Sequence, residues 1–363
     1  MKEFLVRIRN GLFALGYKWI LKPIFFRIDP EIVHDCMLKF GRLLGSNVVT
    51  RFGTRIAFGY SHPMLEQTVA GIKFMNPVGL AAGFDKNAEL TRIIPEVGFG
   101  FEEVGSVTGE RCTGNAKPRL WRHTEERSLR VNYGLMNDGA EAISQKMSGK
   151  KFRIPIGISI AKTNDATTVE TEQGIADYVK AYRAFEQIGD YITINISCPN
   201  AFGGQPFTDV NKLDALLNAI ARLPKNKPVF LKLSPDLEPQ QLDEIASIAD
   251  KYEIDGFVCS NLTKKHSFGN GGLGGKLQQP RSDEQIKFLY KRYGGRKIII
   301  GCGGIFTAED AYLKIKAGAT LVQMVTGMIY EGPQTISEIN RCLVAFLKKD
   351  GHSNIKSAIG TGV

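Results

Sequence analysis

From residue 76 onward, short apolar runs alternate with longer segments whose apolar positions recur at helical spacing. The short runs are rich in Val, Ile and Phe, which is typical of buried strands. We predict eight strands, at Val78–Ala82, Phe101–Val107, Ile154–Ile160, Tyr191–Ile196, Val229–Leu233, Gly256–Ser260, Lys297–Gly301 and Thr320–Val325. The amphipathic segments predict helices near residues 87–97, 138–147, 173–188, 210–222, 238–252, 282–293, 307–317 and 333–349.

Alternation of strands and helices implies parallel strands joined by helical crossovers. Eight such units predict an α/β fold, a (β/α)8 TIM barrel over residues 46–363. A doubly wound open sheet is the alternative, but no GxGxxG pattern follows the first strand. We expect a short antiparallel piece around Ile56–Phe58 and Ile72–Phe74 to cap the bottom of the barrel. The long Gly-rich segments 108–137 and 261–280 are typical of lids or binding loops.

The first sixth of the chain carries most of the net charge. The total is +10, and residues 1–60 contribute ten Lys/Arg against four Asp/Glu, which is +6. Residues 1–45 read as two helices in which basic residues interleave with large apolar ones such as Phe13 and Trp19. This pattern is typical of a helix lying in the membrane interface and is too apolar for a nucleic-acid-binding arm. The alternatives are helices packed on the body of the protein and an oligomer contact.

Four charges interrupt every apolar run near the N-terminus that could span a bilayer, at Arg7, Arg9, Lys18 and Lys22. We therefore expect a peripheral membrane protein, on the cytoplasmic side, with no nucleic-acid partner. The six cysteines are scattered, without a CxxC pair or a Cys/His cluster at zinc spacing. We expect neither a disulfide framework nor a metal site. We see no secretory signal with a cleavage site.

A thiol and two amides stand where the fourth predicted strand ends, in the run Asn195–Asn200. The carboxyl ends of the strands are where parallel barrels place their chemistry. Cys198 is a candidate proton acceptor, and Asn195 and Asn200 can each donate and accept hydrogen bonds. The alternative is a buried cysteine in a strand-end turn.

Glycine-rich turns follow the seventh and eighth strands, at Gly301–Ile305 and around Thr326. Glycine lets the backbone approach a ligand, and loops at this position bind phosphate in such barrels. Gly275 could join them, and the alternative is tight turns without a ligand. At the first strand end, small residues leave room for a flat ring beside Lys86. Lys232 lies within an apolar strand, where its charge is costly unless it faces an anionic partner; otherwise it points outward between helices.

Amides and hydroxyls near five strand ends should converge on this same volume, at Ser106, Ser159, Asn195, Ser260 and Asn261. Together these residues resemble the dihydroorotate dehydrogenase family. The N-terminal extension and Gly79–Lys86 resemble its membrane-associated, quinone-reducing class 2. Further resembling motifs are Lys117–Arg122, Asn195–Asn200, Pro235-Asp236, Gly272–Gly275 and Gly301–Ile305. The resemblance covers nearly the whole chain in order. It implies FMN-dependent oxidation of dihydroorotate to orotate in pyrimidine biosynthesis, with electrons passed to a membrane quinone.

The resemblance also implies roles for individual residues, with Cys198 as the catalytic base. It implies FMN contacts at Ala81, Ala82, Gly83, Ser106, Ser159, Asn195, Lys232, Ser260, Gly275, Gly304, Val325 and Thr326. It implies substrate contacts at Lys86, Asn132, Gly134, Leu135, Asn195, Asn200 and Asn261. His34 and Arg122, with the N-terminal helices, would line a quinone tunnel.

Four positions depart from the class 2 pattern. Cys198 stands where class 2 has Ser, as in the soluble class 1. Val131 replaces a substrate-contacting Asn, for which Asn132 or Asn137 could substitute, while Leu262 and Val325 replace a Thr and a Tyr. These departures leave open a flavin paralogue with a different acceptor or a related cyclic-amide substrate. From the residues alone, a flavin-free phosphate-binding barrel isomerase or lyase also stays open.

Overall fold

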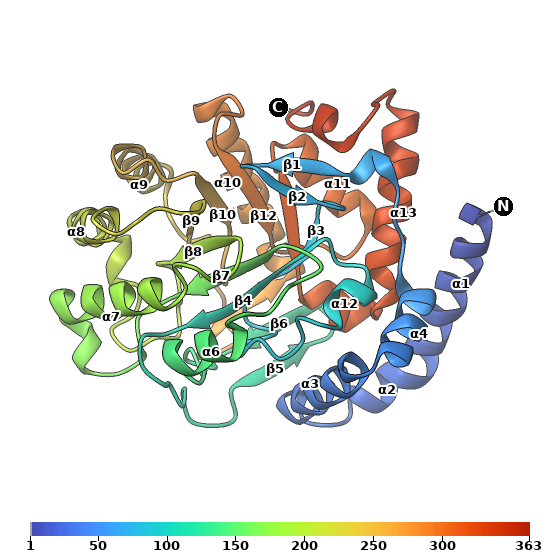
Figure 1. Ribbon diagram of the computed structural model, residues 1–363, viewed down its shortest axis with the longest axis horizontal. Helices are drawn as coiled ribbons and strands as arrows, with labels where there is room; N and C mark the ends of the chain where they lie inside the picture. The colour runs from blue at the N-terminus through green and yellow to red at the C-terminus, as the bar shows by residue number, and fades with distance from the viewer. Residues whose placement is uncertain (1) are drawn as a thin grey trace.

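The computed structural model describes residues 2–363 and contains the predicted closed barrel (Figure 1). Its eight strands are parallel and neighbour one another in the order β10-β12-β13-β3-β4-β7-β8-β9. Their bounds are β3 Val78–Leu80, β4 Phe101–Val107, β7 Ile156–Ile160, β8 Tyr191–Asn195, β9 Val229–Lys232, β10 Gly256–Cys259, β12 Ile298–Cys302 and β13 Leu321–Met324. All eight predicted strands are confirmed. They appear in the sequence as continuous apolar runs because each strand is buried on both faces, between the barrel interior and the outer helices.

A small hairpin closes the bottom of the barrel. It pairs β1 (Gln67–Val69) with β2 (Ile72–Phe74). Val69 and Phe74 pack there against buried side chains of the barrel interior. The expectation of an antiparallel cap at Ile72–Phe74 is confirmed, but its predicted partner was wrong. Ile56–Phe58 instead forms the last turn of a helix, because tertiary packing outweighs the weak intrinsic preference of so short a segment.

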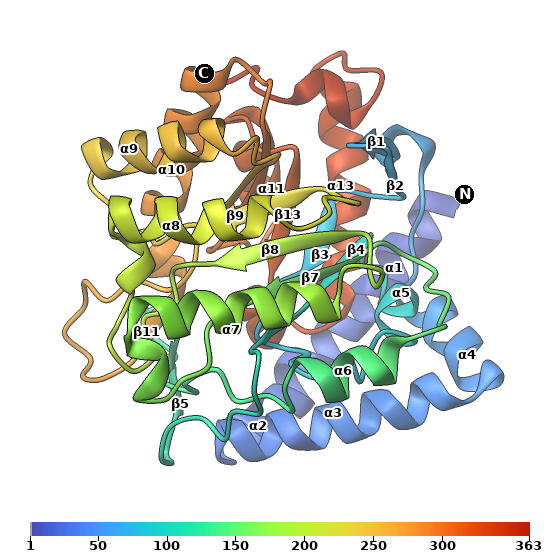
Figure 2. The ribbon, with the colours of Figure 1, turned by 60° about the vertical axis from the view of Figure 1, so that its left-hand side comes forward.

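Outer helices cover the barrel, as Figure 2 shows for α7, α8 and α9. Their bounds are α5 Ile94–Val97, α6 Ala140–Met147, α7 Thr171–Ala184, α8 Val210–Ala221, α9 Pro239–Lys251, α10 Gln279–Tyr293, α11 Ala308–Lys316, α12 Thr326–Glu331 and α13 Gln334–Lys349. Short 3-10 turns lie at Pro63–Leu65, Thr167–Val169, Pro206–Thr208, Lys276–Gln278 and Ile355–Ala358. The predicted helix near 87–97 is wrong over most of its length. The Asp85 carboxylate accepts the N–H groups of Glu89 and Leu90, which holds this segment in turns.

The N-terminal helices form what we call the helical layer, residues 2–58. A continuous helical run comprises α1 (Lys2–Gly16), a π-helical turn (Tyr17–Leu21) and α2 (Lys22–Phe25). Then come α3 (Pro30–Ser46), capped by the Asp29 carboxylate, and α4 (Val48–Phe58), capped by the Asn47 side chain. The helices thus continue past residue 45. Figure 2 shows α3 along one edge of the molecule, and α3 also contacts the strand β5 (Leu120–His123).

The two long Gly-rich segments pair with one another. They contribute β5 (Leu120–His123), β6 (Ser128–Val131) and β11 (Gly272–Gly275) to an antiparallel sheet of order β11-β6-β5. In this cover sheet Gly272 lies opposite Val131, and Gly275 lies opposite Ser128. The segments were predicted as lids or binding loops, and the structure places a sheet within them, close to the strand ends described next.

Candidate active site

The carboxyl ends of the barrel strands surround two adjacent cavities, of about 190 Å³ and about 100 Å³. Both are bordered by Ala82, Lys232, Asn261 and Thr326, so together they form one mouth cavity. The larger half, which we call the substrate half, also borders Cys198. The smaller half borders a row of glycines, and we call it the glycine half. Of the five polar strand-end residues expected to converge here, Ser106, Asn195, Ser260 and Asn261 border the cavity and Ser159 does not.

Most of the residues predicted to contact a cofactor line the glycine half. They are Ala81, Ala82, Lys232, Ser260, Gly275, Gly304, Val325 and Thr326. Gly304 has a φ of +73°, and a Cβ there would lie 2.2 Å from the Cβ of Gln279, so the backbone conformation requires glycine. The Gln278 amide, which sequence reasoning missed, donates to the Ser260 hydroxyl at 2.7 Å. Gly83 lies at the rim of the substrate half instead.

A buried polar network forms the floor of the mouth cavity. Lys232 is 4% exposed, and its Nζ lies 3.8 Å from Oε1 of Glu103, on β4. The other Glu103 oxygen accepts hydrogen bonds from Thr193 Oγ1 and Gln323 Nε2, each at 3.0 Å. Lys232 therefore points into the barrel and not outward between helices. Because Lys232 borders both halves from the floor, its ammonium offers a positive charge to a ligand in either half.

A short chain of hydrogen bonds crosses three strand ends beside this floor. Asn195 Nδ2 donates to Ser106 Oγ at 2.8 Å, and Ser106 Oγ lies 2.7 Å from Ser159 Oγ. Asn195 and Ser106 border the substrate half. Ser159 is fully buried and does not border it, so Ser159 holds Ser106 in place from behind.

Lys86 is a buried cation at the entrance of the substrate half. Its ammonium lies 4.1 Å from the centre of the Tyr133 ring and has no hydrogen-bond partner within residues 2–363. Burial lowers the pKa of Lys86 to about 8. Buried polar groups are almost always paired. An unpaired ammonium that borders a cavity therefore indicates an anionic ligand.

The asparagines of the substrate half are partly engaged. Asn200 Nδ2 donates to the carbonyl of Val131 at 2.8 Å, whereas its Oδ1 has no partner in the described chain. Asn261 Nδ2 donates to Asn195 Oδ1 at 3.2 Å. Together with Lys86, these groups suit a small anion that also carries amide groups.

Cys198 borders the substrate half, and the residue as a whole is half-buried. Burial raises the pKa of its thiol above the ordinary value, and the backbone N–H of Asn200 and the charge of Lys162 oppose that rise. The thiol does not face only the apolar core, which was the alternative considered for it. A thiol at a cavity that also holds a cation can act as a proton acceptor.

The loop predicted to hold the substrate is only partly in place for that role. Gly134 and Leu135 border the substrate half, but Asn132 does not. Asn132 Oδ1 instead accepts a hydrogen bond from Asn115 Nδ2 at 3.0 Å. Asn137 does not border the cavity either, since its amide donates to Thr108 and to the Leu135 carbonyl.

Asn115 was missed by sequence reasoning because it lies inside a long loop, away from any strand end. Its Nδ2 also donates to the carbonyl of Asn200 at 3.0 Å, and its Oδ1 accepts from Asn164 at 2.9 Å. It thus joins three loops at the mouth of the barrel.

The helical layer reaches the mouth cavity through His34, on α3. His34 borders the cavity, and its Nε2 lies 2.9 Å from the Phe84 carbonyl. Burial lowers the pKa of His34 to about 3, so the imidazole is neutral at physiological pH. Arg122 does not border the cavity; it donates to the Ile28 carbonyl at 2.8 Å and lies over the Phe26 ring.

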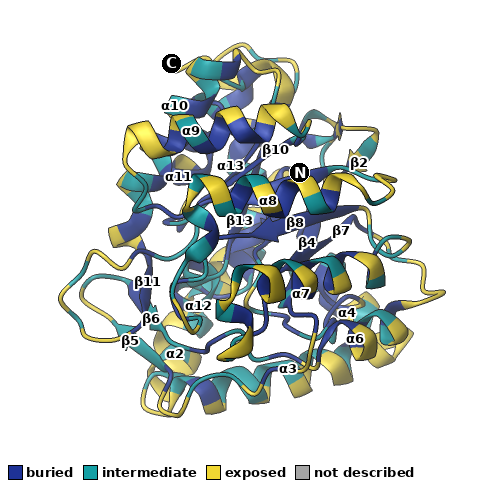
Figure 3. Ribbon diagram, turned by 90° about the vertical axis from the view of Figure 1, so that its left-hand side faces the viewer, coloured by how far each residue is buried: buried dark blue, intermediate teal, exposed yellow. Residues whose placement is uncertain are grey.

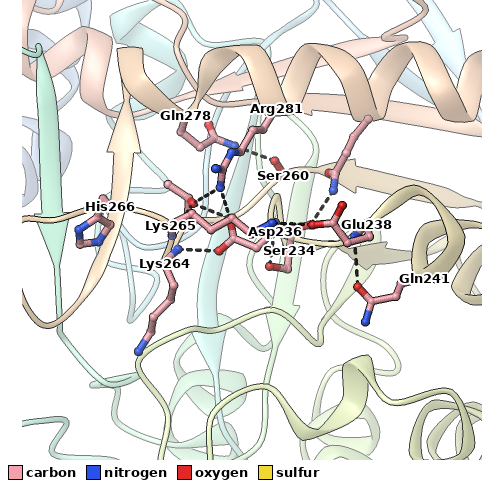
Figure 4. A network of polar contacts seen from close by, with 12 residues as sticks. Ser234, Asp236, Glu238, Gln241, Ser260, Lys264, Lys265, His266, Gln278 and Arg281 are labelled. Carbon is pink, nitrogen blue, oxygen red and sulfur yellow. Dashed lines mark hydrogen bonds and ion pairs between the residues drawn. The ribbon is translucent and has the colours of Figure 1, made fainter.

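A second polar network ties the loop before β11 to the loop after β9 (Figure 4). The Asp236 carboxylate accepts from Thr263 Oγ1 at 2.5 Å and from the Lys264 backbone N–H at 2.6 Å, and it pairs with Arg281. Lys265 pairs with Glu238 at 2.6 Å. Asp236 was noted in the sequence only as part of a motif, and the structure assigns it this anchoring contact.

Comparisons with known proteins agree with this geometry. The sequence model of the family Dihydroorotate dehydrogenase matches residues 64–347. The chain belongs to the dihydroorotate dehydrogenase family. A protein named "Dihydroorotate dehydrogenase (quinone)" from Nautilia profundicola is 35% identical over 95% of this chain and 96% of its own length. One of the same name from Gloeobacter violaceus is 36% identical over 94% of this chain and 98% of its own.

The fold matches that of a solved family member. The crystal structure of ligand-free DHODH from Eimeria tenella has a TM-score of 0.81 and 28% identity, covering 92% of this chain and 99% of that one. Within residues 2–363, no helix has both the length and the apolarity that crossing a membrane requires. The same residues hold no cluster of three or more His, Cys, Asp or Glu that could bind a metal ion.

Proposed function

We propose that the mouth cavity binds FMN in its glycine half and dihydroorotate in its substrate half. The chain is a dihydroorotate dehydrogenase of the quinone-dependent kind, an oxidoreductase of pyrimidine biosynthesis, as its family and its relatives along nearly its whole length indicate. The single observation that carries the proposal is that one cavity is lined by both a cysteine and an unpaired buried ammonium.

The family is flavin-dependent, and the residues present fit a flavin mononucleotide. Glycines at 275 and 304 let a phosphate approach the backbone, and the Thr326 hydroxyl can donate to it. Lys232 offers a positive charge to the electron-rich edge of the ring system. When bound, a flavin accepts the hydride that leaves the substrate and passes the electrons on to the quinone. The residues that would hold it are Ala81, Ala82, Gly83, Ser106, Asn195, Lys232, Ser260, Gly275, Gly304, Val325 and Thr326, with Ser159 behind them.

In the substrate half, the chain supplies binding and proton transfer. The Lys86 ammonium pairs with the carboxylate of dihydroorotate. The side chains of Asn195, Asn200 and Asn261 bond to its cyclic amide, with the free Oδ1 of Asn200 as one acceptor. Cys198, as the thiolate, would accept the proton from the ring carbon next to the one that gives up its hydride. General-base catalysis of this kind contributes about 10²–10⁴-fold in rate.

The helical layer is the proposed route for the quinone. Its α3 brings the neutral His34 to the cavity, and Nδ1 of His34 has no hydrogen-bond partner among the described residues. Exposed apolar residues on the layer, interleaved with basic ones, suit the surface of a membrane, on the cytoplasmic side. Arg122, on β5 and bonded to the turn after α2, would act at the outer end of the route. We divide the chain accordingly into an N-terminal helical extension and an FMN-binding barrel.

The relatives do not favour the alternatives considered from the sequence. A paralogue with another acceptor or another cyclic amide rests on Val131, Leu262 and Val325. Val131 supplies its backbone carbonyl to Asn200, so the substrate loop remains attached to the site in spite of the lost asparagine side chain.

A steady-state assay tests the proposal. Dihydroorotate is offered with ubiquinone, fumarate or NAD as acceptor, and the cofactor released by denaturation is identified by mass. We expect turnover with the quinone and release of FMN. Turnover with fumarate or NAD and none with the quinone, or a purified protein without flavin, would overturn it.

A further inference from the structure

The buried surroundings of Cys198 disfavour the negative charge that its proposed role as a base requires. The proposed base must lose its proton before it can take one from the substrate, yet burial raises the pKa of this thiol. A thiolate in such surroundings needs a nearby positive charge. Lys86 and Lys232 border the cavity, but the proposed function commits them to the substrate carboxylate and the cofactor.

A third lysine, Lys162, lies behind Cys198. It follows β7, is 3% exposed, and borders the same small pocket of about 10 Å³ as Cys198 and Tyr178. No carboxylate within residues 2–363 lies in ion-pair distance of it, unlike Lys232, which faces Glu103; Asp165 and Asp177 act on it only from farther away. A buried cation without a paired anion is costly, which indicates that its charge serves a neighbour.

Lys162 also holds the loop that carries Cys198. Its Nζ donates to the Phe202 carbonyl at 3.0 Å and to Thr168 Oγ1 at 3.3 Å. The Phe202 N–H in turn donates to Asn164 Oδ1. The loop after β7 therefore bonds both the carbonyl and the N–H of Phe202, which lies four positions after Cys198.

We propose that Lys162 is a positioning residue for the base: its ammonium stabilises the Cys198 thiolate from behind, while its bond to Phe202 fixes the loop. This rests on the proposed function, in which Cys198 accepts the substrate proton. The proton balance is simple, because the thiolate becomes a thiol as it takes the proton, and Lys162 keeps its own throughout. Other titratable groups face the thiol or its cavity, namely Tyr178, Cys112, Lys86, Lys232, His34 and Tyr133.

The test measures the thiol without turnover. The substrate-free holoenzyme is alkylated with iodoacetamide between pH 6 and 10, and modification of the Cys198 peptide is followed by mass spectrometry. In Lys162→Met we expect the titration of Cys198 alkylation to move upward in pH, with slower alkylation near neutrality. Lys162→Arg keeps the charge and should stay close to wild type. Lys180→Met removes an exposed cation of α7 that pairs with Glu110, and should leave the titration unchanged.

A variant of Asn164, which accepts the Phe202 N–H, separates the effect of the Lys162 charge from the effect of anchoring the loop. Asn164→Ala releases the Phe202 N–H without changing any charge, so the thiol should titrate as in wild type. The proposal is overturned if Lys162→Met titrates like wild type, or if Asn164→Ala reproduces its shift. Should Lys162→Met fail to fold, Lys162→Gln and the arginine variant decide the same question. Failure of the base assignment would look different, since Cys198→Ala would then turn over normally whatever the alkylation profiles show.

Discussion

In the barrel, large apolar side chains are buried, whereas the helical layer turns the same residue types outward. Phe101, Tyr191 and Phe257 are fully buried in the barrel, while Leu12 and Trp19 of the helical layer are 65% and 69% exposed. Figure 3 shows this contrast between the buried strands and the partly exposed helices of the layer. At the mouth the pattern inverts again, because buried polar groups gather there, and two of them, Lys86 Nζ and Asn200 Oδ1, have no hydrogen-bond partner in the described chain. This difference fits the proposed function, in which the mouth binds a polar substrate and the helical layer meets an apolar phase.

Of the variants that test this comparison, we expect the largest effect from the one that removes the proposed base from the mouth cavity. Cys198→Ala should lower the rate of flavin reduction by dihydroorotate about 10²–10⁴-fold, because the proton then has no positioned acceptor. The flavin should remain bound, since the glycine half is untouched. Anaerobic stopped-flow absorbance measures both. Cys198→Ser is the milder companion and should move the optimum to higher pH. An alanine variant that reduces its flavin at the normal rate would remove Cys198 from the chemistry.

The joint between the regions is a buried ion pair. Glu31, on α3, accepts from Arg119 at 2.8 Å, and the two side chains are 6% and 7% exposed. Glu31→Ala leaves the guanidinium buried without its anion, so the free energy of unfolding should fall by about 3 kcal/mol. Denaturant melts monitored by circular dichroism measure this. Glu66→Ala breaks the surface pair with Lys73 and should cost less than about 1 kcal/mol. Equal losses in both variants would show that the joint adds nothing.

The helical layer is tested by making its exposed face polar. Leu12→Asp combined with Trp19→Asp should weaken binding to anionic lipid vesicles at least about 100-fold, since each such side chain contributes ~1.5–3 kcal/mol when it leaves water. Flavin reduction by dihydroorotate should be unchanged. Leu313→Asp changes a leucine of α11 that is 60% exposed, and serves as the matched control. Undiminished vesicle binding by the double variant would separate the layer from the membrane.

The smallest effect concerns pH. The pKa of Lys86 is lowered by burial to about 8, so its charge is present below that pH and is lost above it. Orotate affinity, followed by the flavin spectral shift, should therefore fall roughly tenfold between pH 7 and pH 9. Lys86→Met should bind weakly at both values and show no such inflection. A wild-type affinity that is flat across this range would mean that Lys86 does not hold the substrate anion.

The barrel could be predicted from the sequence because strand and helix periods are local signals. The cover sheet could not: β11 is Gly272–Gly275, nearly all glycine, and its partner β6 lies about 140 residues earlier in the chain. The predicted strand at Ile56–Phe58 failed for a related reason, since contacts with α5 decide that segment. Much of the candidate site could be predicted because its polar residues lie at the carboxyl ends of predicted strands. Asn115 and Lys162 were missed because they act through other residues and do not border the mouth cavity, whereas Gln278 borders it from a short turn after β11 and not from a barrel strand end.

The central claim is that a flavin lies in the mouth cavity within reach of substrate and Cys198. Its most direct test is the visible spectrum of the purified holoenzyme, recorded without oxygen before and after dihydroorotate is added. We expect a flavin spectrum that bleaches with the substrate and returns when a quinone follows. A protein without flavin absorbance, or a flavin that dihydroorotate leaves oxidised, would contradict the account.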